Sequence, residues 1–249
     1  MPNGAAASAA RTRRSWFYSI MSAVVLAAVA IGFGRTYAVP MANGTFHAPP
    51  VVHVHGMFAA AWVLLFALQP LLVRWKKLPW HRSIGRIGLP LALGVALTML
   101  PAGMAQTARE VSAGAGPTGV SILLGVGTSA VMFMLLVAAG IWARRDREAH
   151  ARWLLLATLV VAWPAWFRFR HYFPGVARPD IWFAVVLADV WIVVAMLRDR
   201  ITRGRVHPVL AWAGTGIILE HAVESFTFDN GPWRAAAQGM YDALRGLGL

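Results

Sequence analysis

Seven long apolar segments follow one another along the chain, separated by shorter polar stretches. A helix that crosses a bilayer needs roughly 20 mostly apolar residues. The pattern predicts seven spans, at residues 16–33, 54–73, 87–104, 118–143, 153–167, 181–197 and 209–226. These segments use most of the 249 residues. We therefore expect an all-α, polytopic transmembrane bundle of seven helices, with no second globular domain.

The flanking regions complete the expected organisation. Residues 1–14 are small, polar and basic and predict a cytoplasmic tail. The uncharged run 15–34 is longer than the apolar core of a typical signal peptide, so we expect a retained helix rather than a cleaved leader. The transmembrane domain is then 15–228, and 229–249 is a short extracytoplasmic C-terminal segment.

Positive charge is distributed unevenly between the two sets of loops. The formal net charge is +13, although only 13% of the residues are charged and 58% are hydrophobic. With the N-terminus inside, sixteen of the 23 Lys and Arg residues fall on the inner side. This asymmetry follows the positive-inside rule and predicts a cytoplasmic N-terminus and an external C-terminus. The basic inner loops are expected to contact anionic lipid headgroups, and the charge needs no nucleic-acid partner to explain it.

The chain contains no cysteine. Disulfides, thiolate metal sites, iron–sulfur clusters and c-type haem attachment are therefore excluded.

One carboxylate is predicted deep in the membrane. Asp189 stands at the centre of the span 181–197. An intramembrane ionisable residue is costly and suggests a functional site. We expect a proton relay, a cation or ligand contact, or a structural hydrogen bond to a neighbouring helix. Arg168, at the outer end of the preceding span, is the nearest basic residue in the sequence.

A second polar group lies on the last span. Glu220, His221 and Glu224 are three or four residues apart and share one helical face. Carboxylates beside an imidazole can bind a divalent metal or handle protons. The alternative is that the span ends near Leu219 and the three side chains are solvated.

A His-x-His pair opens the second span. His53 and His55 point the same way only if the chain is extended, and Pro49 and Pro50 just before them favour that conformation. Neutral imidazole is the commonest protein metal ligand. Two interfacial histidines without a ligand are the plainer interpretation.

The predicted topology places several of these side chains at the outer face. They are His53, His55, His171, Glu220, His221 and Glu224, together with Arg168 and Arg170. A polar group between helices is where a bundle usually keeps its ligand. The sequence therefore predicts a His/Glu/Arg site at the outer membrane face, binding a metal ion or haem for redox or hydrolytic chemistry.

Four functional hypotheses remain open. Haem b would be held by two of His53, His55, His171 and His221, with His53 or His55 opposite His221 as the axial pair. A divalent-metal site would use His53, His55, Glu220, His221 and Glu224. A transporter or channel would use Asp189, Glu220 and Arg168 along a polar path. The fourth is an accessory subunit of a membrane complex without chemistry of its own, so enzymatic activity stays undecided.

Histidines also follow the basic inner runs. His81, His150 and His207 each stand near the start of a helix, where they serve as interfacial side chains or form a cytoplasmic site.

Short motifs around these residues carry a resemblance. They are His55-Gly56, His81-Arg82-Ser83-Ile84-Gly85, Ala149-His150-Ala151-Arg152 and Val206-His207-Pro208. Together, from span two to span seven, they resemble a group of bacterial multi-helix membrane proteins without an assigned activity. The resemblance implies the architecture and a bacterial plasma membrane location; Glu220 and His221 are not part of its pattern.

Overall fold

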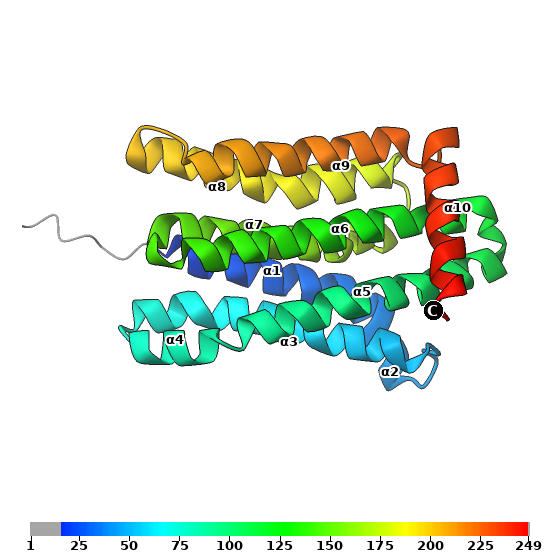
Figure 1. Cartoon of the computed structure of the whole chain (residues 1–249), viewed down its shortest axis with the longest axis horizontal. Helices are drawn as coiled ribbons and strands as arrows, with labels where there is room; N and C mark the ends of the chain where they lie inside the picture. The colour runs from blue at the N-terminus through cyan, green and yellow to red at the C-terminus, as the bar shows by residue number, and fades with distance from the viewer. Residues whose placement is uncertain (1–15, 249) are drawn as a thin grey trace, which may run out of the picture.

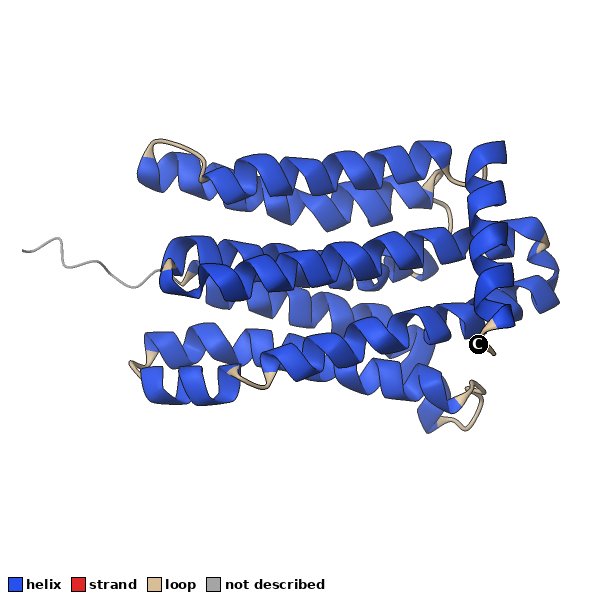
Figure 2. Cartoon of the chain, in the orientation of Figure 1, coloured by secondary structure: helices blue, strands red, loops and turns tan. Residues whose placement is uncertain are grey.

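The chain folds into helices throughout the part that the structure describes. The computed structural model describes residues 16–248, is 87% helical and contains no strand in that range (Figure 2). The all-α class predicted from the sequence is confirmed. The predicted cytoplasmic tail, 1–14, lies outside the described residues.

The helices are labelled in Figure 1. The first half holds α1 (Phe17–Phe33), α2 (Val39–Ala42), α3 (Pro50–Arg74), α4 (Leu78–Gly85) and α5 (Gly88–Glu110). The second half holds α6 (Pro117–Trp142), α7 (Arg147–Phe167), α8 (Leu187–Arg203), α9 (Thr215–Thr227) and α10 (Gly231–Gly246). Wider π-helical turns extend four of these helices: η1 (Gly34–Ala38), η2 (Val111–Ala115), η5 (Asp180–Val186) and η6 (Leu210–Gly214). Two short 3₁₀ segments, η3 (Ala143–Arg145) and η4 (Arg168–His171), flank α7.

Five helical stretches within residues 16–248 are long and apolar enough to cross a membrane. They are Phe17–Ala42, Pro50–Arg74, Leu78–Ala115, Pro117–Arg145 and Asp180–Arg203. The chain is therefore a multi-pass membrane protein by length and composition. The other two predicted spans are helical but are not among the five. Charged groups explain this, since α7 begins with Arg147, Glu148 and Arg152, and the stretch 210–227 carries two glutamates.

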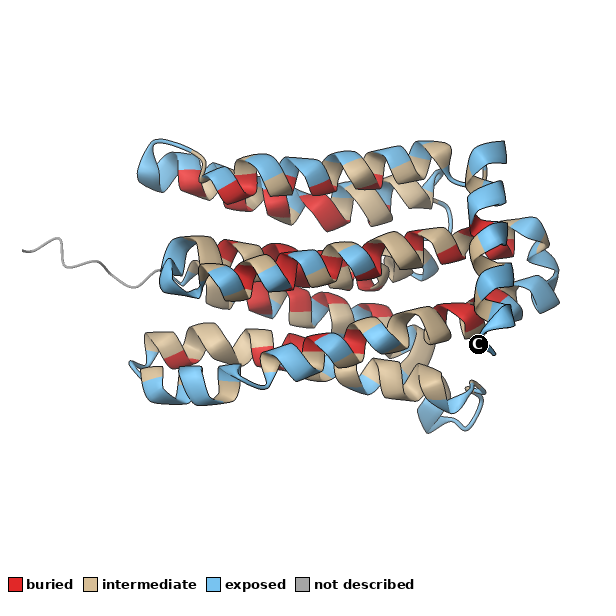
Figure 3. Ribbon diagram, in the orientation of Figure 1, coloured by how far each residue is buried: buried red, intermediate tan, exposed pale blue. Residues whose placement is uncertain are grey.

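The centre of the bundle is α7. It packs against α1, α6 and α8, and ten of its residues are buried (Figure 3). Leu155, Leu156 and Val160 are fully enclosed, as expected for a helix that is apolar all round. Gly32 of α1 lets that helix approach closely, because a Cβ there would lie 2.3 Å from the Ala165 carbonyl oxygen.

The basic connections gather at one end of the bundle. The loops α3–α4, α6–α7 and α8–α9 all lie at the left of Figure 1, opposite α10. These loops carry Lys76 and Lys77, Arg144 and Arg145, and Arg205. The charge asymmetry seen in the sequence is thus an asymmetry between the two ends of the fold.

The C-terminal segment is a helix. α10 lies across the opposite end of the bundle, transverse to the other helices (Figure 1). The Asn230 side chain accepts a hydrogen bond from the Trp233 amide and caps its first turn, where Pro232 is also favoured. The Trp233 indole N–H donates to the Ser121 carbonyl at 2.9 Å and ties α10 to α6.

Candidate functional site

A buried carboxylate–imidazole pair joins α8 to α9. The His221 Nδ1 and Asp189 Oδ1 atoms are 2.8 Å apart, a hydrogen bond in which the ring N–H donates to the carboxylate. Asp189 is 5% exposed and His221 is 7% exposed. The partner of Asp189 is therefore His221, whereas the sequence pointed to Arg168. Hydrogen bonding is what a buried charge or polar group requires inside a bundle.

Each member of the pair keeps one polar atom free. Asp189 Oδ2 and His221 Nε2 are buried and have no hydrogen-bond partner among the described residues. With Nδ1 committed to Asp189, Nε2 is the atom of His221 that can exchange a proton or bind a ligand. Buried polar atoms in native folds are almost always hydrogen-bonded, so these two atoms have bonding capacity that no described residue uses.

Two glutamates extend the pair. Glu220 Oε2 lies 3.8 Å from His221 Nε2. Glu224 projects from the next turn of α9 onto α6, and a Cβ at Gly125 would lie only 2.1 Å from Glu224 Oε1. The predicted shared face of Glu220, His221 and Glu224 is therefore present, and Asp189 joins it from α8. We call these four residues the outer site, after the membrane face at which the predicted topology would place them.

The sequence held a signal for this pairing. α8 and α9 are antiparallel neighbours joined by the turn at 204–207. Asp189 lies 15 residues before Gly204, and His221 lies 14 residues after His207. Residues equally far from the turn of a helical hairpin lie at the same depth. This spacing therefore predicts that Asp189 and His221 lie at the same level of the two helices.

His53 and His55 belong to a different part of the bundle. His53 Nδ1 is 2.8 Å from the Tyr37 hydroxyl, and His55 Nδ1 is 3.0 Å from Thr98 Oγ1 of α5. α3 and α5 lie on one side of the bundle and α8 and α9 on the other, with α6 and α7 between them (Figure 1). The structure therefore does not bring the predicted axial pair of His53 or His55 with His221 together.

Arg168 and His171, which follow α7, also make their contacts away from the outer site. Arg168 donates to Thr36 Oγ1 at 3.1 Å and to the Pro164 carbonyl at 2.9 Å, and its guanidinium lies 4.1 Å from the centre of the Phe33 ring. It is fastened to α1 rather than to Asp189. His171 is exposed in η4, where partial desolvation and the charges of neighbouring arginines hold its pKa below the ordinary value.

Within residues 16–248, no three His, Asp or Glu side chains are placed so that they could hold a metal ion together. The predicted metal set His53, His55, Glu220, His221 and Glu224 is thus divided between two sides of the bundle.

A second buried charge cluster was not predicted. Arg152 of α7 and Asp199 of α8 are each 1% exposed, and Arg152 Nε donates to Asp199 Oδ2 at 2.8 Å. Arg152 Nη1 also donates to Glu148 Oε2 at 2.6 Å, and Arg203 pairs with the same Glu148 oxygen. The predicted span begins at residue 153 and leaves Arg152 in the basic connection before it. Its contact with α8 is a tertiary property that the sequence pattern does not give. All three guanidinium nitrogens of Arg152 donate hydrogen bonds to carboxylates, so this cluster holds α7 and α8 together.

The three histidines that follow the basic runs make different hydrogen-bond contacts. His150 Nδ1 is 2.7 Å from the Gly140 carbonyl, whereas the backbone N–H of His207 donates to Asp199 at 3.3 Å. His81 Nδ1 is buried without a hydrogen-bond partner among the described residues.

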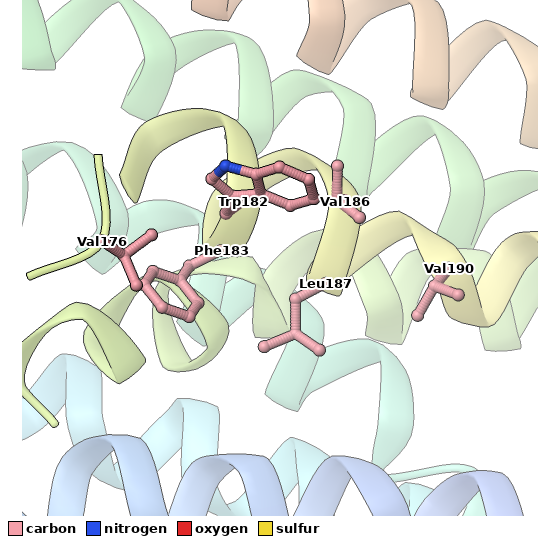
Figure 4. Close-up of a pocket in the computed structure, with 6 residues that line it drawn as sticks. All are labelled: Val176, Trp182, Phe183, Val186, Leu187 and Val190. Atoms are coloured by element: carbon pink, nitrogen blue, oxygen red, sulfur yellow. The ribbon is translucent and has the colours of Figure 1, made fainter. Parts of the chain in front are cut away.

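An apolar hollow of about 500 Å³ opens beside η5 and α8 (Figure 4). It is lined by Val176, Trp182, Phe183, Val186, Leu187 and Val190. None of the predicted site residues lines it, and it offers no polar group for catalysis. Its side chains suit contact with lipid.

Fold and site together define a class: a multi-pass helical membrane protein with a buried Asp–His pair. No family model matches the chain, and no curated protein or solved structure matches it either. Function is therefore argued from the outer site itself.

Proposed function

We propose that this chain is a proton-handling membrane transporter or channel in which the outer site takes up and releases the proton. The observation that carries the proposal is the 2.8 Å contact between Asp189 and His221, with Asp189 Oδ2 and His221 Nε2 left buried and free. Imidazole and carboxylate are the side chains that most readily exchange protons near neutral pH.

The composition of the outer site favours a cation as its cargo. Three carboxylates, Asp189, Glu220 and Glu224, surround a single imidazole. Even with His221 protonated, full ionisation of the acids would leave excess negative charge in a low-dielectric environment. Binding a proton relieves that charge, which is why such clusters mark proton relays in membrane proteins.

The proposed topology has seven spans, a cytoplasmic N-terminus and an external C-terminus, in the plasma membrane of a bacterium. α7 and the stretch 210–227 complete the seven by crossing between the two ends of the bundle. The gathering of basic connections at one end supports that end as the cytoplasmic one. The bacterial membrane rests on the sequence resemblance described above.

Proton flux into liposomes tests the proposal. Purified protein is reconstituted with an internal pH-sensitive dye, and a pH step is applied outside. We expect Asp189→Asn and His221→Gln to abolish protein-dependent flux. Asp242→Asn on the exposed face of α10 is the matched control and should keep it. Equal flux in all four proteins would contradict the proposal.

A second function is favoured by the orientation of His221. A ligating histidine usually donates its other ring N–H to a carboxylate, and Asp189 supplies that partner while Nε2 stays free. His221 could therefore bind a metal ion, or the iron of haem b, through Nε2. The further ligand would be a group that does not contact His221 in the structure. Absorption spectra of air-oxidised and dithionite-reduced protein, with metal analysis, test this.

His221→Ala should remove any bound cofactor, whereas His55→Ala, on the other side of the bundle, should leave it in place. If the wild-type protein shows neither proton flux nor a bound cofactor, the hypothesis of an accessory subunit is the one that remains.

A further inference from the structure

The outer site depends on a helix that is loosely packed. Within α9, all of which is described, Ile217 and His221 are the buried residues. α9 packs mainly against η5, in the neighbouring helix of its own hairpin. Glu224 nevertheless rests on Gly125 of α6, with no room for a Cβ between them. A separate contact must hold the outer end of α9 against α6.

That contact is a carboxylate with four hydrogen bonds. Asp229, in the loop after α9, accepts from Ser121 Oγ and from Thr118 Oγ1, each at 2.7 Å. It also accepts from Arg234 Nε and Nη2, each at 2.6 Å. Thr118 and Ser121 lie in the first turns of α6, and Arg234 lies in the first turn of α10. We call these four residues the Asp229 latch, since they join α6, α9 and α10.

The backbone at the latch is strained. Asp229 has φ +63°, a left-handed conformation that L-residues other than Asn and Asp rarely adopt. Such a conformation persists only where surrounding contacts over-determine it, and it concentrates where geometry matters to function. The Arg234 hydrogen bond also holds the pKa of Asp229 well below its usual range, so the latch stays charged and closed at neutral pH.

The latch lies one helical turn away from the outer site. Ser121 and Gly125 are four residues apart on α6 and face the same way. On the other side, Asp229 follows Glu224 by five residues. The Asp229–Ser121 bond and the Glu224–Gly125 contact are therefore consecutive links between the same two helices.

We infer that the Asp229 latch positions Glu224 beside His221 and so sets the proton affinity of the outer site. Asp229 is a positioning residue here, because its carboxylate is committed to α6 and α10 and acts on the site through α9. The effect on proton affinity rests on the proposed function, whereas the positioning of α9 does not.

Spin-label distances test the positioning. The natural chain lacks cysteine, so Val131→Cys on α6 and Val223→Cys on α9, at positions 62% and 58% exposed, give a specific label pair. Asp229→Ala, and Thr118→Val with Ser121→Ala, should lengthen and broaden the distance distribution. Asp242→Asn should leave it unchanged. An unchanged distribution in both latch variants would overturn the inference.

Infrared titration of the protonated carboxyl bands tests the consequence. We expect latch variants to shift the titration midpoint of the outer site by about one pH unit, roughly tenfold in proton affinity. Asp229→Asn, which tolerates the left-handed backbone and keeps one acceptor, should fold well and shift less. A displaced α9 with an unmoved midpoint would reduce the latch to a structural role and overturn the inference.

The two proposals fail differently. If the infrared carboxyl bands of the protein with an intact latch do not change in Asp189→Asn or Glu224→Gln, the proposed function is contradicted. The distance measurement still decides whether the latch positions α9.

Discussion

The guanidinium of Arg152 is a full charge with almost no access to water, and Asp199 beside it is equally enclosed. Removing one partner of a buried pair leaves an uncompensated charge, which costs about 3–5 kcal/mol. Because Glu148 still pairs with Arg152 in Asp199→Ala, we expect this variant to lower the unfolding free energy by about 3 kcal/mol, the lower end of that range. Thermal and denaturant unfolding in detergent measure it.

Replacing both partners tests whether charge is the cause. The double variant Arg152→Met with Asp199→Leu removes the uncompensated charge, so it should recover most of the lost stability. Asp242→Asn, at an exposed position, should change stability by no more than about 0.5 kcal/mol. A double variant less stable than Asp199→Ala would show that the cluster stabilises by packing rather than by charge.

Helical spacing was enough to group residues on one helix, whereas contacts between residues on different helices also required knowing which helices pair. Helical spacing alone placed Glu220, His221 and Glu224 on one face, because the period of a helix is fixed. The partners of Asp189 and His55 depend on which helices become neighbours. Thr98, the partner of His55, is an ordinary polar residue within an apolar segment and gave no signal of its own.

At the scale of elements, α10 depends on the latch, and the latch depends on an ionised carboxylate. The folded-state pKa of Asp229 is depressed, mainly by its hydrogen bond from Arg234. Its contribution is therefore fully present above the unfolded-state value, near pH 4, and is lost as pH falls further toward the folded pKa. We expect α10 to detach from α6 in that acidic range.

A spin label on Gly239→Cys, at an exposed position of α10, reports this detachment as a gain in mobility. Asp229→Ala should show the mobile spectrum already at neutral pH. A label that stays equally immobile from neutral to strongly acidic pH would mean that other contacts, such as the Trp233–Ser121 hydrogen bond, hold the helix.

The apolar segments made the long helices predictable, but α10 was described only as a short external segment. It is amphipathic rather than apolar, and Gly231, Gly239 and Gly246 weaken its helical signal. Trp233 and Ala237 dock this helix against the bundle, a tertiary contact that an apolar pattern does not predict. The π-helical starts of the α8 and α9 segments, η5 and η6, were equally hidden, since the apolar pattern does not distinguish them from α-helix.

The number of times that the whole chain crosses the membrane depends on α7 and the stretch 210–227. Each is flanked by exposed positions that can carry a single cysteine in this cysteine-free chain: Arg145 and Gly175 around α7, and Arg205 and Gly239 around 210–227. If both segments span, the members of each pair lie on opposite sides.

We expect an impermeant maleimide added to intact cells to label Gly175→Cys and Gly239→Cys, and to label Arg145→Cys and Arg205→Cys only after permeabilisation. Labelling of both members of a pair from the same side would remove that segment from the membrane and reduce the number of spans. This matters for mechanism, because the outer site lies between α8 and α9. If 210–227 did not span, His221 and Glu224 could exchange protons with only one compartment, and the pair could serve binding or catalysis but not transport.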